Sequence, residues 1–138
     1  MPASFSINPI GVVRKTDHDS CIEIFDEYAD GLLGLEGFSH IYVFYWFDQN
    51  DTPEKRQTLQ VHPRKDPRNP LTGVFATHSP LRPNLIALTR CKIGAIANNI
   101  IAIDEVDAYD GTPVIDIKCY IPGSPEASDV RVPDWLKK

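Results

Sequence analysis

Apolar and polar residues alternate over many short stretches of this chain, and turn residues separate these stretches. The aromatic and β-branched run at residues 40–47 predicts a central strand buried on both faces. Alternation at residues 21–25 predicts a half-buried strand. Further strands are expected at residues 5–13, where Asn8-Pro9 makes the strand irregular, and at residues 73–77, 85–93, 95–103, 106–109 and 114–121.

Other segments favour turns and loops. Residues 27–33 predict a helical turn that ends at Gly34 and Gly37. Polar residues and four prolines fill residues 48–71, which indicates a long loop around one short strand at residues 58–61. The tail from Pro122 onward is expected to be a loop that Trp135 anchors.

These elements predict an all-β fold, namely a small β-barrel or a strongly curved sheet with short helical turns. Long helices do not alternate with the strands, as a doubly wound sheet would require. At 138 residues the chain has the length of a single domain, and we expect residues 1–138 to share one core.

Composition places the chain among ordinary globular proteins. Hydrophobic residues make up 42% of the sequence and charged residues 24%, which gives no support to disorder or a coiled coil. No stretch approaches 18 uninterrupted apolar residues, and the first residues do not have the pattern of a signal peptide. We therefore expect a cytoplasmic protein with no membrane partner. Cys21, Cys91 and Cys119 have no paired spacing, so buried free thiols are favoured over a catalytic cysteine.

Charge is distributed unevenly along the chain. The net charge of −5 argues mildly against a protein that coats nucleic acid. Residues 17–30 are strongly acidic, whereas residues 54–68 carry five cations, Lys55, Arg56, Arg64, Lys65 and Arg68, against Glu54 and Asp66. This asymmetry permits a local RNA-facing surface, although an ordinary solvated loop has the same composition.

Polar side chains that could bind a ligand gather in two turns. Residues 76–84 include His78 and Arg82 between prolines that restrict the backbone, which lowers the entropy cost of holding a ligand. Asp116 and Lys118 are two residues apart and therefore lie on one face of the last strand. They could share the rim of a pocket, or they could form a structural salt bridge.

The sequence lacks the common nucleotide and zinc motifs. It contains no glycine-rich dinucleotide motif, Walker-type loop, H-E-x-x-H or C-x-x-C. The histidines are scattered, so we expect no metal site.

Five motifs occur in a specific order along residues 7–122. They are Ile10-Gly11-Val12-Val13-Arg14, Leu35-Glu36-Gly37-Phe38-Ser39-His40, Gly73-Val74-Phe75-Ala76-Thr77, Arg82-Pro83-Asn84 and Asp110-Gly111-Thr112-Pro113-Val114-Ile115-Asp116-Ile117-Lys118. In these motifs the chain resembles the TsaA-like family, which contains the methyltransferases that act on N6 of threonylcarbamoyladenosine at position 37 of tRNA.

The resemblance implies a small β-barrel methyltransferase that uses S-adenosylmethionine and holds it near a homodimer interface. It places the cofactor among Gln49, Asn50, Asp51, His78, Arg82, Leu88, Asp110, Gly111 and Thr112. Asp116 and Lys118 are expected next to the acceptor, with Asp116 as base or hydrogen-bond acceptor. Lys118 would either orient Asp116 or neutralise a carboxylate or phosphate of the substrate.

Two alternatives to N6 methylation of tRNA stay open at this stage. The segment between Arg14 and Cys21 is shorter than in the bacterial tRNA enzymes, and their additional C-terminal region is missing. These departures, together with the acidic net charge, favour a methyltransferase for a small metabolite or for another RNA position. A non-catalytic binding module with the same fold is the second alternative.

Overall fold

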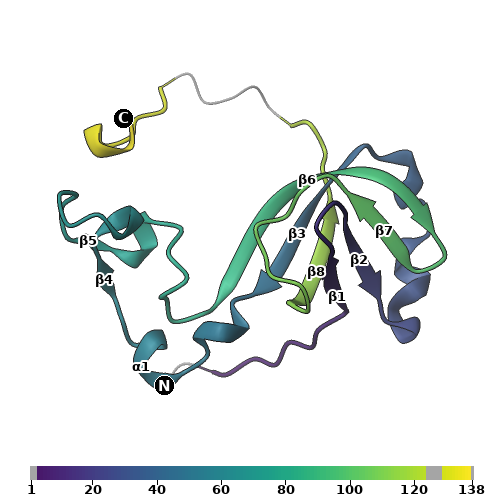
Figure 1. The fold of residues 1–138 in the computed structure, drawn as a ribbon, viewed down its shortest axis with the longest axis horizontal. Coiled ribbons are helices and arrows are strands. Elements are labelled where there is room, and N and C mark those ends of the chain that lie inside the picture. The colour runs from purple at the N-terminus through teal and green to yellow at the C-terminus, as the bar shows by residue number, and fades with distance from the viewer. Residues whose placement is uncertain (1–2, 124–128, 138) are drawn as a thin grey trace.

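Six antiparallel strands close into a barrel in the order β1-β2-β7-β6-β3-β8 (Figure 1). The computed structural model describes residues 3–123 and 129–137 of the protein. The barrel strands are Gly11–Lys15 (β1), Ser20–Ile24 (β2), His40–Trp46 (β3), Ile86–Ala97 (β6), Ile100–Ile103 (β7) and Pro113–Cys119 (β8). The predicted mainly β fold is confirmed.

The barrel interior is filled by one side of each strand. Its fully buried side chains are mostly β-branched, a shape that packs well on pleated strands: Val13, Ile22, Ile41, Val43, Ile101 and Val114. On β3, buried residues alternate with half-exposed ones, so the prediction that this strand is buried on both faces is wrong. A closed barrel has a single interior, and the alternate side chains of β3 therefore point outward.

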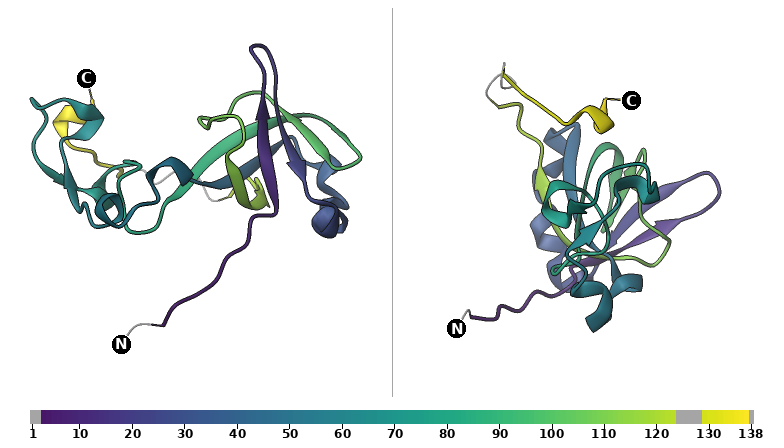
Figure 2. Two further views of the ribbon diagram at one scale, coloured as in Figure 1. Left: turned by 60° about the horizontal axis from the view of Figure 1, so that its bottom comes forward. Right: turned by 90° about the vertical axis from the view of Figure 1, so that its left-hand side faces the viewer.

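The first strand begins later than the pattern predicts. Residues 3–10 form no strand, and Phe5 is 90% exposed on a segment that runs away from the barrel (Figure 2). Pro9 has no N–H to donate to a neighbouring strand, which accounts for the late start. β1 starts at Gly11, where a side chain would collide with the backbone carbonyl of Glu23 on β2.

The third quarter of the chain forms a hairpin whose turn differs from the prediction. β6 continues through Gly94 to Ala97 because a register shift between Ile93 and Ile96 absorbs the irregularity against β7. The turn lies instead at Asn98, which has a positive φ of 56°. Residues 106–109 are not a strand, and the loop that contains them follows the edge of β6, where the Asp104 N–H donates to the Lys92 carbonyl.

Residues 47–85, hereafter the arm, project from the barrel between β3 and β6 (Figures 1 and 2). The arm contains the four-residue helix Pro53–Arg56 (α1) and a two-stranded sheet of Gln60–Val61 (β4) and Thr72–Gly73 (β5). β4 confirms the short strand expected inside the loop. The expected strand at residues 73–77 is wrong, because Val74–Ala76 (η5) is a 3-10 turn.

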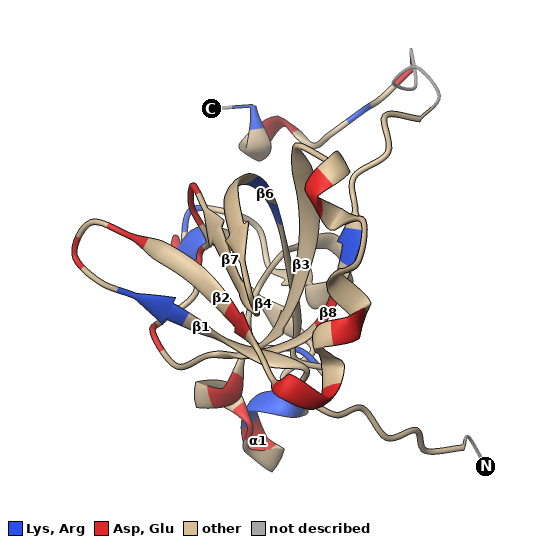
Figure 3. Ribbon diagram, turned by 90° about the vertical axis from the view of Figure 1, so that its right-hand side faces the viewer, with Lys and Arg blue, Asp and Glu red and all other residues tan. Residues whose placement is uncertain are grey.

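Short 3-10 helices make up the remaining elements. Asp26–Leu32 (η1) and Leu35–Gly37 (η2) confirm the helical turn after β2, and Gly34 between them adopts a φ of 88°. Figure 3 shows acidic residues on these turns. The others are Asp48–Asn50 (η3), Pro63–Lys65 (η4) and Asp134–Leu136 (η6).

The expected C-terminal tail lies partly outside the described residues, at positions 124–128 and 138. Trp135 is half-buried in η6. None of the helices in the described residues has the length and apolarity needed to cross a bilayer.

Candidate functional site

The outward side chains of β6, β3 and β8 form one surface, hereafter the outer face. Because Val43 and Tyr45 point into the barrel, the residue between them, Phe44, points outward. Phe44 pairs with Leu88 on β6 and with Asp116 on β8, so these three side chains form one row. Lys118 pairs with Tyr42 in the next row. The structure thus brings Leu88, Asp116 and Lys118 onto one face, as the sequence predicted for the last two.

Asp116 presents an available carboxylate on this face. Its side chain is exposed, and its Oδ1 accepts a hydrogen bond from the Ile117 backbone N–H at 2.9 Å. Within the described part of the chain, Asp116 and Lys118 form no ion pair with each other. A structural salt bridge therefore does not explain this pair of residues. The second oxygen of Asp116 remains available to an N–H donor of a ligand.

A polar network connects the outer face to the base of the arm. The Trp46 indole N–H donates to Asp51 Oδ2 at 3.1 Å. Arg56 Nη1 donates to Asp51 Oδ1 at 3.2 Å, and its guanidinium lies 5.6 Å from the Trp46 ring centroid. Arg56 Nε also donates to the Pro83 carbonyl at 2.9 Å. Asp51 therefore links Trp46 to Arg56 at the base of the arm.

The other predicted cofactor residues of the arm lie on either side of this network. Gln49 is exposed and Asn50 half-buried, and Lys55 Nζ lies 3.5 Å from the Gln49 carbonyl and from Asn50 Oδ1. His78 is exposed. Arg82 Nη1 donates to the Thr77 and Ser79 carbonyls at 3.3 and 2.9 Å. Because arginine has five N–H donors, Nε and Nη2 of Arg82 remain for a ligand carboxylate.

The turn at residues 110–112 lies apart from this group. Asp110 Oδ1 accepts from the Lys15 backbone N–H at 2.8 Å, and the Gly111 N–H donates to the Val13 carbonyl at 2.7 Å. Gly111 has a φ of 87°, which an L side chain rarely adopts, and Thr112 is buried. These bonds fix the turn to β1, and no hydrogen bond or ion pair between the described residues joins its side chains to Leu88, Asp116 or Lys118. The predicted cofactor residues therefore form two groups in one chain.

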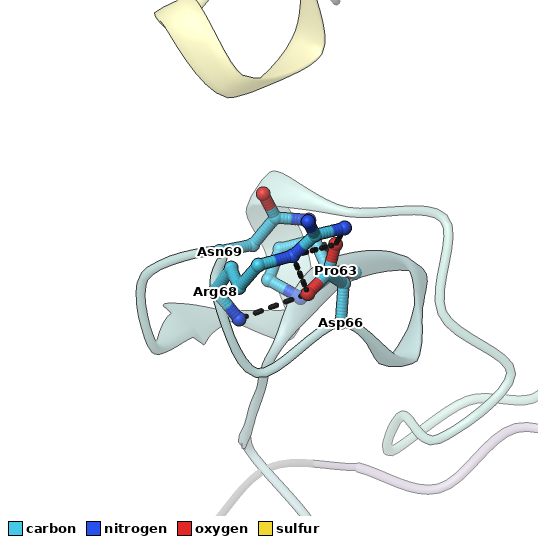
Figure 4. A network of polar contacts seen from close by, with 4 residues as sticks. All are labelled: Pro63, Asp66, Arg68 and Asn69. Carbon is cyan, nitrogen blue, oxygen red and sulfur yellow. Dashed lines mark hydrogen bonds and ion pairs between the residues drawn. The ribbon is translucent and has the colours of Figure 1, made fainter.

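The basic segment of the arm has fewer unpaired cations than its composition suggests. Arg68 makes an ion pair with Asp66 at 2.8 Å, and Asn69 Nδ2 donates to the Pro63 carbonyl, which closes the loop (Figure 4). Arg64 and Lys65 are exposed and have φ values of 61° and 56°. They are the two cations of the segment for which the described residues provide no polar side-chain partner.

Comparison with known proteins identifies the family. Residues 6–125 match the model of the tRNA-methyltransferase O N-terminal domain. The chain belongs to this family. The match to this family model confirms the resemblance that the five ordered motifs indicated.

Several known proteins are similar to this chain. A probable S-adenosyl-L-methionine-binding protein of Methanocaldococcus jannaschii is 50% identical over 116 residues, which cover 84% of this chain and 92% of that protein. A tRNA (adenine(37)-N6)-methyltransferase of Mus musculus is 41% identical over 98 residues, 71% of this chain but 22% of its own length. The crystal structure of TrmO from Pseudomonas aeruginosa has a TM-score of 0.73 at 25% identity and covers 98% of this chain and 63% of its own.

In this family member, a partly apolar pocket beside Asp116 was not predicted from the sequence. It has a volume of about 410 Å³ between η1, η2 and the edge of β8. Its lining includes Tyr28, Leu33, Phe38 and Ile117 besides Asp116. Sequence reasoning also missed the outward aromatic residues of β3. Their alternation with buried residues was the available signal, but the uniformly apolar composition of the strand concealed it.

The thiols do not form a reactive centre. Cys91 is fully buried, and burial raises the pKa of its thiol to about 11. Burial also raises the pKa of Cys21. The thiolate is the nucleophilic form, so neither residue suits a catalytic role at neutral pH. Among the described residues, no three His, Cys, Asp or Glu side chains are grouped to hold a metal ion.

Proposed function

We propose that this protein transfers the methyl group of S-adenosylmethionine to N6 of threonylcarbamoyladenosine at position 37 of tRNA. Family membership and the name of the mouse relative support the reaction, and the name of the archaeal relative supports the cofactor. The structural observation that carries the proposal is the position of Asp116 and Lys118, side by side and unpaired, on the outer face beside Leu88.

The residues present suit this cofactor. The methionine carboxylate requires a cation or N–H donors, and Arg82 has Nε and Nη2 available at the base of the arm. Leu88 is 56% exposed next to Phe44 and offers an apolar surface for the adenine ring. Asp110 Oδ2 accepts no hydrogen bond from the described residues and could accept hydrogen bonds from ribose hydroxyls. When bound, S-adenosylmethionine supplies an electrophilic methyl group on a sulfonium.

The protein's own residues align the acceptor and remove its proton. With S-adenosylmethionine held beside Leu88, the Asp116 carboxylate would accept the N6 proton that methylation of the acceptor releases. An N6 atom that carries a carbonyl substituent is a weak nucleophile, so a hydrogen-bond acceptor at its N–H aids the displacement. Lys118, which forms no ion pair with Asp116 in the described part of the chain, is proposed to face an anionic group of the substrate, such as the threonyl carboxylate. Positioning provides most of the remaining rate enhancement.

We further propose that the site is completed in a homodimer. Among the described residues, no hydrogen bond or ion pair joins the outer-face residues to the turn at residues 110–112, and a second copy could bring the two groups together. The arm supports this arrangement because its side chains Leu59, Leu71 and Phe75 are 56%, 58% and 80% exposed. Apolar side chains gathered on an extended segment favour a protein partner. Sedimentation at micromolar concentration should give twice the 15.5 kDa of the chain.

The decisive experiment uses nucleoside mass analysis. Unmethylated tRNA that carries N6-threonylcarbamoyladenosine is incubated with the protein and S-adenosylmethionine, digested, and compared with a reaction without protein. The proposal predicts that this nucleoside gains the mass of one methyl substitution, whereas tRNA without the threonylcarbamoyl group gains none. Such a tRNA substrate places the expected activity in the cytoplasm.

Other results of the same experiment identify the alternatives. Methylation of a different nucleoside contradicts the acceptor but retains the enzyme class. If no RNA is methylated, cofactor binding separates the remaining two functions. Stabilisation of about 2.7 kcal/mol is expected at a concentration one hundred times the dissociation constant, and its absence indicates a non-catalytic module that does not use the cofactor.

A further inference from the structure

Six side chains form a basic and aromatic surface at one end of the outer face. His40 and Tyr42 on β3 pair with Lys92 and Arg90 on β6, and Tyr42 also pairs with Lys118 on β8. Tyr120 follows β8, and its backbone N–H donates to the His40 carbonyl at 3.0 Å. We call these residues the basic-aromatic patch: His40, Tyr42, Arg90, Lys92, Lys118 and Tyr120.

The rings of the patch hold one another in place. The Tyr42 and Tyr120 rings meet edge to face, with centroids 5.4 Å apart. The Arg90 guanidinium lies 5.2 Å from the Tyr120 ring centroid, and the His40 ring lies 6.2 Å from it on an edge-to-face contact. The three rings are only half-buried. A ligand therefore meets aromatic surface whose conformational freedom is already restricted.

The cations of the patch form no ion pairs with the described residues, although Asp104 Oδ1 accepts from the Lys92 backbone N–H at 2.9 Å and lines a hollow beside Arg90. Arg90, Lys92 and Lys118 are exposed, and the described residues offer none of them an ion pair. By contrast, Arg14, Arg56 and Arg68 on other surfaces each pair with a carboxylate. Three cations without an ion pair among the described residues therefore surround the rings, with carboxylates such as Asp104 on the Arg90 side, on a chain of net charge −5.

We propose that the basic-aromatic patch binds single-stranded RNA, with the rings stacking on bases and the cations contacting phosphates. Single-stranded nucleic acids bind to surfaces that combine aromatic side chains with a positive groove, and exposed β-sheets often carry such rings. The patch itself is inferred from its own geometry. The identity of the RNA as the anticodon loop, which contains position 37, rests on the proposed function.

The location of the patch suits a substrate that continues toward Asp116. The next row along the strands contains Leu88, Phe44 and Asp116, two residues and therefore about 7 Å from the row of Tyr42. A loop whose flanking nucleotides occupy the patch can thus present its neighbouring base to the Asp116 carboxylate. This arrangement assigns recognition to one end of the outer face and the reaction to the adjoining row.

Four variants test the cations and the rings separately. Binding of an anticodon stem-loop and of oligouridylate is measured by fluorescence anisotropy over a series of salt concentrations. The double variant Arg90→Ala/Lys92→Ala should bind both RNAs more weakly, with a slope of log affinity against log salt reduced by about 1.4. Tyr42→Ala should bind at least about tenfold more weakly, whereas Tyr42→Phe, which keeps the ring, should bind normally. Arg14→Ala on β1 is the matched control and should leave binding unchanged.

Each alternative result has a definite meaning. An unchanged salt slope in the double variant, or no RNA binding by the wild-type protein, overturns the patch as an RNA site. Weaker self-association in sedimentation with unchanged RNA binding also overturns it and identifies the surface as a subunit contact. Methyl transfer to tRNA is measured separately. Patch-dependent RNA binding without transfer contradicts the proposed function alone, and transfer that is insensitive to the patch variants contradicts this inference alone.

Discussion

The barrel and the arm differ in how far they bury their apolar side chains. The barrel buries its apolar side chains in a closed interior, with Ile22, Ile41 and Ile101 almost inaccessible to solvent. The arm has two strands of two residues each and a helix of four, and it leaves Phe75 80% exposed. Val74 and Leu85 of the arm are buried, and the rest of its order comes from turns, prolines and polar contacts such as the Asp51–Arg56 pair.

This difference indicates that the barrel provides most of the folding stability, whereas the arm serves binding. A closed barrel satisfies its own strand edges and core, so the barrel should fold without help from the arm. An extended segment with exposed apolar side chains has little to stabilise it alone, and such segments commonly serve binding. We infer that the barrel sets the position of Asp116, and that the arm adapts to a partner.

The largest expected effect is the loss of stability when the barrel core is truncated. Ile101→Ala removes fully buried methyl groups and should lower the free energy of unfolding by about 2–5 kcal/mol. Phe75→Ala on the arm should change the stability of the monomer by less than about 0.5 kcal/mol. Urea denaturation of both variants at low protein concentration measures this contrast. Equal destabilisation would mean that the arm is part of the folding core.

The next effect concerns the proposed reaction at the barrel surface. Asp116→Asn keeps the size of the side chain but removes its charge, and it should slow methyl transfer about a hundredfold or more. Cofactor affinity should change far less, because Asp116 is expected to face the acceptor. Single-turnover rates, cofactor binding and melting temperature are measured on the same preparation. A lower melting temperature with an unchanged rate per folded molecule would make Asp116 structural.

The sequence predicted much of the barrel because strand patterns are local. Residues 21–25 alternate, and β2 occupies almost the same positions. The errors arose where a distant contact decides the structure. Gly94 resembles a strand end but continues β6 through a register shift against β7, and residues 106–109 resemble a strand but run beside β6 as a loop. The local sequence around Gly94 does not reveal the register shift, and the local sequence of residues 106–109 does not reveal that they form a loop.

The candidate site was predictable only in part. Two-residue spacing placed Asp116 and Lys118 on one face, and the structure agrees. That Leu88 shares a row with Asp116 depends on the register of both strands against β3, which no local pattern gives. Asp51 looked available in the sequence, yet Trp46 and Arg56 occupy its carboxylate. The cofactor roles of the individual residues remain predictions.

A smaller effect is expected at the tip of the arm. Arg64→Ala/Lys65→Ala removes the two cations without a polar side-chain partner and should weaken tRNA binding, with a salt slope lower by about one to two. Arg68→Ala should have little effect on the slope, because Asp66 already neutralises that guanidinium at 2.8 Å. Filter binding over a salt series compares the two variants. If Arg68→Ala has the larger effect, the Arg68–Asp66 ion pair of the free protein must break when RNA binds.

The smallest effect tests how well the barrel excludes water. Burial raises the pKa of the Cys91 thiol from 9.0 to about 11, so an unfolded chain loses this proton at a lower pH than the folded chain does. Between about pH 9 and pH 11 the unfolded state therefore binds fewer protons, and the stability of the protein should fall as the pH rises. Below about pH 8 the thiol is almost fully protonated in both states and contributes almost no slope.

Cys91→Ala should remove this contribution, by at most about 1.4 kcal/mol per pH unit, and its unfolding free energy should decline less steeply than that of the wild type. Burial also raises the pKa of Tyr45 in both proteins, and the part of this rise that comes from the Cys91 thiolate is lost in Cys91→Ala together with the thiol. Cys119→Ala, which removes a thiol at a half-buried position lining the partly apolar pocket, is the matched control. Parallel curves for Cys91→Ala and the wild type would show that water reaches the barrel interior, since only a solvated thiol titrates alike in both states.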